Sequence, residues 1–106
     1  MSEESYIRPP VVAGMFYPEH AGDLERMVEL LMDNAKPKRK RGRLIGIIVP
    51  HAGYQYSGAT AAHAFALLKK EKKHTVVLVG PSHREYFDGI SVFSGSSFKT
   101  PLGAVE

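Results

Sequence analysis

Two short runs of apolar, mostly β-branched residues stand out along the chain, at 44–49 and 75–79. Each run is continuous rather than alternating, which is typical of strands buried on both faces of a parallel sheet. A proline follows each run within two residues and ends the predicted strand, because proline cannot donate to a ladder. A third, weaker strand is predicted at 90–93.

Helical periodicity occurs in two other segments. Residues 22–34 predict an amphipathic helix whose apolar positions follow the i, i+3, i+4, i+7 pattern, at Leu24, Met27, Val28 and Leu31. The alanine-rich stretch 58–70 predicts a second helix, with Ser57 as its N-cap. Because this helix separates the two apolar runs, the order is strand, helix, strand. The predicted fold class is therefore α/β, with a βαβ-containing, mostly parallel sheet.

The remaining segments predict one domain, 1–106, with two peripheral parts. Residues 1–20 predict an extended arm, since prolines push their predecessors away from helical geometry. Residues 36–43 predict a basic linker that holds six of the fourteen Lys and Arg residues and no Asp or Glu. Outside it, eight basic residues face eleven acidic ones, a net charge of −3. The linker is either solvated or in contact with phosphates or anionic lipid, and the rest of the domain offers no basic nucleic-acid platform.

Composition limits the classes of protein that remain. With 106 residues and 43% hydrophobic residues, the chain can build one modest core. It has no cysteine, so disulfides and metal sites that need thiolates from this chain are excluded. No apolar run is long enough to cross a bilayer, and the acidic start does not resemble a signal peptide. We therefore expect a soluble, cytoplasmic protein that binds neither nucleic acid nor membrane.

Two histidines follow the predicted strands closely. His51 comes two residues after the run 44–49, and His83 comes four residues after the run 75–79. Ligands of open parallel sheets bind beyond the carboxyl ends of the strands, and neighbouring strands lie about 4.8 Å apart. Imidazoles from both ends could therefore reach one metal ion. The alternative is that each histidine only forms hydrogen bonds within its loop; His20, His63 and His74 are assigned no role.

The segment 53–60 follows the first predicted strand and opens the second predicted helix. Its glycines, Gly53 and Gly58, have the separation of a P-loop, but Ala59 stands where the phosphate-binding lysine would be. Nucleotide hydrolysis is therefore not expected. The helix start near Ser57 still offers free N–H groups to an anionic group of a substrate.

Four motifs occur in a recognisable order: RPPVVAGMFYP at 8–18, PHAGYQYSG at 50–58, GPSH at 80–83 and TPLG at 100–103. In this combination the chain resembles the Memo-like family, called AmmeMemoRadiSam system protein B in prokaryotes. The resemblance implies a fold related to class III extradiol dioxygenases, which hold non-haem iron(II) on two histidines and a carboxylate. Memo-like proteins are similar but use a cysteine as third ligand, and their histidines match His51 and His83.

The resemblance implies iron or copper binding and an oxidoreductase-like activity, although no general reaction is established for the family. Tyr54 and Tyr17 are candidates for lining the substrate pocket, with core packing as the alternative for each. The other functional hypothesis is a non-catalytic module that holds a peptide or small anion in the dioxygenase-like cleft.

The chain departs from the family pattern in length. Family members are much longer and carry the third ligand later, so this chain resembles an N-terminal fragment. Its expected partner is the missing C-terminal segment or a second copy of itself, and it has no function alone if that partner is required. Glu85 or Asp88 could supply a carboxylate close to His83 instead.

Overall fold

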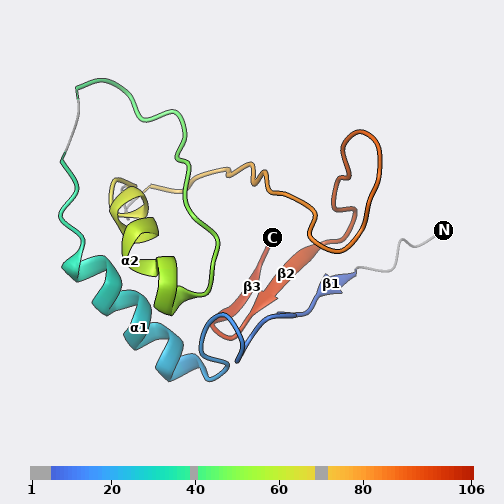
Figure 1. Cartoon of the computed structure of the whole chain (residues 1–106), viewed down its shortest axis with the longest axis horizontal. Coiled ribbons are helices and arrows are strands. Elements are labelled where there is room, and N and C mark those ends of the chain that lie inside the picture. Colours follow the sequence, from blue (N-terminus) through green and yellow to red (C-terminus); the bar gives the residue numbers. More distant parts are fainter. Residues whose placement is uncertain (1–5, 39–40, 69–71) are drawn as a thin grey trace.

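The computed structural model describes residues 6–38, 41–68 and 72–106. A pair of helices lies beside a small three-stranded sheet, and long segments without regular structure connect them (Figure 1). In chain order the elements are β1 (Ile7–Arg8), α1 (Ala21–Asn34), α2 (Tyr54–Phe65), β2 (Ser97–Thr100) and β3 (Gly103–Val105). The fold is thus a small mixed α/β domain, which confirms the predicted class in its coarse form.

The first predicted helix is confirmed almost to the residue. α1 begins at Ala21, one residue before the predicted start, and ends at Asn34 as predicted. Its Leu24 is buried at 4% exposure, as the apolar periodicity requires. No helix within the described ranges is both long enough and apolar enough to cross a membrane.

The second helix is shifted towards the N-terminus. α2 begins at Tyr54, four residues before the predicted start, and its N-cap is Gly53. Ser57 is therefore not the N-cap; it lies in the first turn, where its hydroxyl donates to the carbonyl oxygen of Ala52. The helix ends at Phe65, whereas the prediction ran to 70, and residues 69 and 70 lie outside the described part.

Small residues bring the two helices close together. Ala62 of α2 is buried, and a Cβ placed at Gly58 would lie 2.9 Å from a terminal carbon of Leu31 in α1. A side chain at position 58 would force the end of the Leu31 side chain to move. Together with Leu24, this contact forms the small apolar core of the described residues.

The sheet is built from residues that carried no strong strand signal. Its order is β1-β2-β3, with β1 parallel to β2 and β2 antiparallel to β3. The turn that joins β2 to β3 is closed by Thr100, whose hydroxyl donates to the carbonyl oxygen of Gly103 and accepts from the N–H of Leu102. Gly103 has a φ of +132°, which a residue with a side chain rarely adopts.

The three predicted strands at 44–49, 75–79 and 90–93 are not strands in the described structure. Most of their apolar side chains are open to solvent, with Ile48 at 100% and Val79 at 93% exposure, whereas Ile47, Val49 and Phe93 are half-buried. A strand exists only through its ladder partners, and an apolar run of this kind needs cover on both faces. The described residues supply neither, so the expected βαβ unit does not form among them.

The arm is extended only at its start. β1 is followed by a tight loop over 11–17, in which Gly14 donates its N–H to the carbonyl oxygen of Tyr17 at 2.7 Å. The φ of Gly14, +81°, permits this turn. The prediction of an extended segment to residue 20 is therefore wrong beyond Pro10, and residues 1–5 lie outside the described part.

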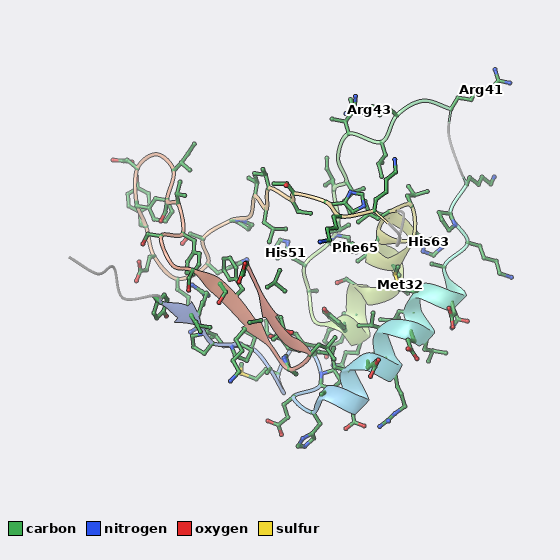
Figure 2. All side chains as sticks on the ribbon, turned by 180° about the vertical axis from the view of Figure 1, so that it is seen from behind. Met32, Arg41, Arg43, His51, His63 and Phe65 are labelled. Carbon is green, nitrogen blue, oxygen red and sulfur yellow. The ribbon has the colours of Figure 1, made fainter. Side chains whose placement is uncertain are left out.

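The basic side chains of the linker are exposed wherever they are described. Lys36, Lys38, Arg41 and Arg43 are all exposed, whereas residues 39 and 40 lie outside the described part. Arg41 and Arg43 extend away from the helix pair in Figure 2. Exposed basic side chains are what both alternatives, a solvated linker and one in contact with phosphates or anionic lipid, require.

The junction between the arm and the sheet leaves no room for a side chain at Gly95. A Cβ there would lie 2.6 Å from the carbonyl oxygen of Tyr6 and 2.3 Å from the ring of Phe93. We expect Gly95→Ala to lower the free energy of unfolding by about 1–3 kcal/mol, as overpacking generally does. Urea unfolding measures this, with Gly46→Ala as the control because a Cβ at Gly46 has no atom within 4 Å. Equal midpoints for the two variants would contradict the tight junction.

Candidate metal centre

The two predicted histidines lie together. The Nε2 atoms of His51 and His83 are 3.2 Å apart, and the ring centroids are 5.2 Å apart with a tilt of 52°. Two imidazoles can share such a contact only if one ring donates a hydrogen and the other accepts it. Both side chains are exposed, so the pair is open to ions and small molecules from solvent.

Local hydrogen bonds shape the loops that carry the two histidines. After His51, the carbonyl oxygen of Ala52 accepts from the hydroxyl of Ser57 at 3.2 Å. Next to His83, the hydroxyl of Ser82 donates to the carbonyl oxygen of Glu85 at 2.6 Å. The residue next to each histidine, Ala52 or Ser82, is therefore held by a hydrogen bond from a serine hydroxyl.

Tyr17 and Tyr54 form an aromatic pair near the histidine loop. Their ring centroids are 5.5 Å apart, with a tilt of 44°, and both side chains are partly buried. Tyr17 also lines a shallow cleft of about 260 Å³, whose wall contains Gly14, Met15, Phe16, Pro18, Met27 and Gln55. The two rings thus pack against each other, and Tyr17 alone also lines this cleft; that either residue lines a substrate pocket stays a prediction.

The environment of Tyr54 opposes ionisation of its phenol. Burial, and secondarily the neighbouring Tyr17, raise the pKa of Tyr54 above its ordinary value of 10.0. The hydroxyl of Tyr54 is therefore protonated at neutral pH and keeps its capacity to donate a hydrogen bond.

This shift predicts a loss of stability in alkali. Below pH 10 both the folded and the unfolded chain hold the Tyr54 proton. As the pH rises past 10, the unfolded chain releases it first, so the free energy of unfolding falls until the folded-state pKa is reached. Unfolding at a series of pH values should show this fall, and Tyr54→Phe should reduce it. Tyr86→Phe is the control, because that ring is 93% exposed; an equal reduction there would contradict the assignment.

A complete ligand set does not occur among the described residues, where no three His, Cys, Asp or Glu side chains form a cluster able to hold a metal. The suggestion that Glu85 or Asp88 completes the site is therefore wrong for this structure. The carboxylate of Asp88 instead accepts a hydrogen bond from the hydroxyl of Tyr86 at 3.1 Å. Asp88, although close to His83 in the sequence, therefore makes its contact within its own loop.

The histidines that were assigned no role lie elsewhere. His63 is on α2, and its Nδ1 donates to the carbonyl oxygen of Ala59 in the preceding turn at 2.7 Å. Figure 2 shows His63 near the end of α2, away from His51. His20 lies 3.7 Å from the carboxylate of Glu19.

Sequence reasoning missed one backbone group that bears on the site. The carbonyl oxygen of Phe16 accepts the N–H of Tyr54 at 2.8 Å, directly after the loop of His51. The available signal was Gly53, which precedes the helix and has no side chain to cap it. A helix start without a side-chain cap leaves its first N–H groups to water or to a carbonyl from another segment.

Fold and geometry together define a small mixed α/β protein with two loop histidines paired through their Nε2 atoms. Comparison with known proteins places it more narrowly. The model of the protein family described as "Memo-like protein" matches residues 8–106, which is nearly the whole chain. The chain therefore belongs to the Memo-like family, as its motifs predicted.

Individual relatives agree with this assignment. The chain is 43% identical over 100 residues to a MEMO1 family protein of Aquifex aeolicus (strain VF5), with 94% of this chain and 36% of that protein covered. It is 41% identical over 100 residues to a MEMO1 family protein of Methanosarcina barkeri (strain Fusaro / DSM 804), with coverage of 94% and 36%. A MEMO1 family protein of Methanocaldococcus jannaschii is 41% identical over 110 residues, with coverage of 94% and 38%. The chain thus spans little more than a third of the length of these relatives.

Proposed function

We propose that this chain carries the histidine part of a mononuclear iron or copper site in an oxidoreductase-like Memo-like protein. The observation that supports the proposal is the 3.2 Å separation of the two Nε2 atoms. Bonds from imidazole to a divalent metal are about 2.0–2.1 Å long, so one ion can contact both nitrogens without a large movement of either ring. Neutral imidazole is also a ligand that suits both iron and copper.

In this proposal His51 and His83 bind the metal through Nε2, and the third ligand comes from a part of the protein beyond residues 1–106. Iron or copper with few protein ligands keeps open coordination positions and changes oxidation state, which is the chemistry that an oxidoreductase needs. Tyr54, three residues after His51, packs its ring on that of Tyr17, and in this proposal the aromatic pair forms part of the pocket wall. The neutral phenol of Tyr54 remains available to orient a bound substrate.

We also propose that 44–49 and 75–79 become strands of a larger sheet, related to that of class III extradiol dioxygenases. The remainder of a Memo-like chain completes it, with a second copy of this chain as the alternative partner. The exposure of Ile45 at 94% and Leu78 at 81% supports this, because isolated side chains of this size gain from burial. The contact between the two histidines supports it further, since it joins the carboxyl ends of both segments.

A second candidate is a binding module that holds a peptide without turnover, and the cleft beside Tyr17 favours it. A small anion at the start of α2 is less well supported than the sequence suggested. The N–H groups of Tyr54, Tyr56 and Ser57 already donate to the carbonyl oxygens of Phe16 and Gly53. Peptide binding that persists after metal removal would favour this second candidate.

The test of the main proposal is the metal content of the purified protein, compared with the His51→Ala/His83→Ala double variant. Oxygen uptake on the same samples tests the oxidoreductase part separately. A double variant that retains the iron or copper content of the parent would refute the proposal.

A further inference from the structure

The first backbone N–H of α2 has its partner in a distant segment of the chain. Tyr54 donates it to the carbonyl oxygen of Phe16 at 2.8 Å. The first N–H groups of a helix lack a partner within the helix, and a polar side chain at the N-cap usually supplies one. Gly53 has no such side chain. The arm therefore caps α2, only three residues after His51.

One further contact binds the arm to the same turn. The ring of Tyr17 packs on the ring of Tyr54, with centroids 5.5 Å apart. The backbone of Phe16 also runs close to Gly53, since a Cβ built at Gly53 would lie 3.5 Å from the carbonyl oxygen of Phe16. The arm thus holds Tyr54, the first residue of α2, through both its backbone N–H and its ring.

The arm has a defined shape at this contact. Gly14 donates its N–H to Tyr17 at 2.7 Å, and Phe16 donates its N–H to Val12 at 2.9 Å. Because Gly14 adopts a φ of +81°, these two bonds close a tight loop that presents Phe16 and Tyr17 side by side. A loop closed by its own bonds can hold a neighbouring segment in place.

The other end of the arm is anchored on the sheet. Tyr6 accepts the N–H of Ser96 at 2.8 Å, and its ring lies 6.1 Å from that of Phe93. β1 then pairs in parallel with β2, with Ile7 opposite Ser97. Figure 1 shows the arm running from this sheet to the loop before α1. It therefore connects the sheet to the start of α2.

From these contacts we infer that the arm, residues 6–17, is the positioning element of the histidine pair and that Tyr17 is its key positioning residue. The arm fixes the start of α2, and the start of α2 fixes the loop that presents Nε2 of His51 towards Nε2 of His83. Tyr17 contacts neither metal nor histidine in this scheme and acts through Tyr54. The inference rests on the proposed function, because it concerns the geometry of the same site.

A purely structural role for the arm predicts a different result. In that case removing the Tyr17 ring lowers stability, but the folded fraction binds metal as the parent does. A positioning role changes the binding constant and the coordination of the metal in protein that is still folded. Cobalt(II) is the suitable probe, since it binds imidazole and its visible spectrum reports the number and arrangement of its ligands.

The experiment titrates cobalt(II) into the parent protein and into Tyr17→Ala, Tyr17→Phe and Tyr56→Ala. We expect Tyr17→Ala to weaken cobalt(II) binding by about tenfold, which is the loss of affinity typical for residues that orient a metal ligand. We also expect it to alter the visible spectrum of the bound ion. Tyr17→Phe keeps the ring and should restore both. Tyr56→Ala is the matched control, because Tyr56 lies two residues further along α2 and is 79% exposed.

The outcomes separate the two proposals. A parent protein that does not bind cobalt(II), or binds it equally after loss of both histidines, overturns the proposed function itself. A parent that binds through the histidines, with Tyr17→Ala unchanged in affinity and spectrum, overturns the positioning role alone. If circular dichroism shows that Tyr17→Ala does not fold, Gly14→Ala replaces it, since it strains the loop that presents Tyr17 without removing any ring. Unchanged cobalt binding in folded Gly14→Ala then overturns the inference.

Discussion

Replacing Ile48 by aspartate should have almost no effect on the 106-residue chain but a large effect once the run 44–49 is paired in a sheet. Ile48 is 100% exposed here, and substitutions at such positions usually change the free energy of unfolding by less than about 0.5 kcal/mol. In a strand covered on both faces, the same carboxylate would be buried without a partner and cost about 3–5 kcal/mol. Urea unfolding of the variant, alone and joined to the remainder of a Memo-like protein, measures both values.

Leu30→Asp is the matched control for this comparison. Leu30 lies on α1 and is 62% exposed, so the substitution introduces the same charge outside the proposed strands. We expect it to cost little in either context. If Ile48→Asp costs as little as Leu30→Asp in the longer protein, the run is not a buried strand and the proposed sheet is wrong. Light scattering on the 106-residue chain adds a second check, since exposed apolar runs favour self-association.

The success of the helix predictions and the failure of the strand predictions have one physical origin. α1 could be predicted because its hydrogen bonds are local and its apolar stripe needs only one neighbour, which α2 supplies beside Leu31. The runs 44–49 and 75–79 have strong strand composition, but their ladders require partners from elsewhere. Among the described residues those partners are lacking, so the apolar side chains that the pattern predicts to be buried are mostly exposed.

The strands that do form, in contrast, lack a strong strand signal in the sequence. β1 and β2 pair although Ile7–Arg8 and Ser97–Thr100 lack an apolar run. Their pairing depends on contacts between residues about ninety positions apart, such as the hydrogen bond from Ser96 to Tyr6. No local pattern encodes such a contact. The start of α2 was misplaced for the same reason, because its cap is the carbonyl oxygen of Phe16 and not a nearby side chain.

The meeting of the two histidines was predictable, whereas their surroundings were not. The expectation that the ends of the two apolar runs lie side by side is met at His51 and His83, although the described residues form no ladder behind them. The arm's contact with Tyr54 was not predicted: Gly53 signals a helix start without a side-chain cap, but no sequence pattern identifies Phe16 as the residue whose carbonyl oxygen replaces it.

The loss of either histidine should remove most of the metal affinity. We expect His51→Ala and His83→Ala each to weaken iron or copper binding by about 100-fold or more, since a direct ligand matters more than the groups that orient it. Metal analysis after dialysis against a fixed free-metal concentration, followed by titration, measures this. His63→Ala is the control, because its ring is held by a hydrogen bond to Ala59 within its own helix.

The double variant distinguishes one shared site from two separate ones. If both imidazoles hold the same ion, the first substitution already leaves the ion on a single nitrogen of this chain, and the second adds little. The effects of two residues that act on one ligand are not additive in this way. If each histidine instead formed an independent weak site, each single variant would lose only the metal bound at its own site, and the loss in the double variant would equal the sum of the two single losses. Additive losses at His51 and His83 would therefore contradict a shared ion, even though the two Nε2 atoms lie only 3.2 Å apart.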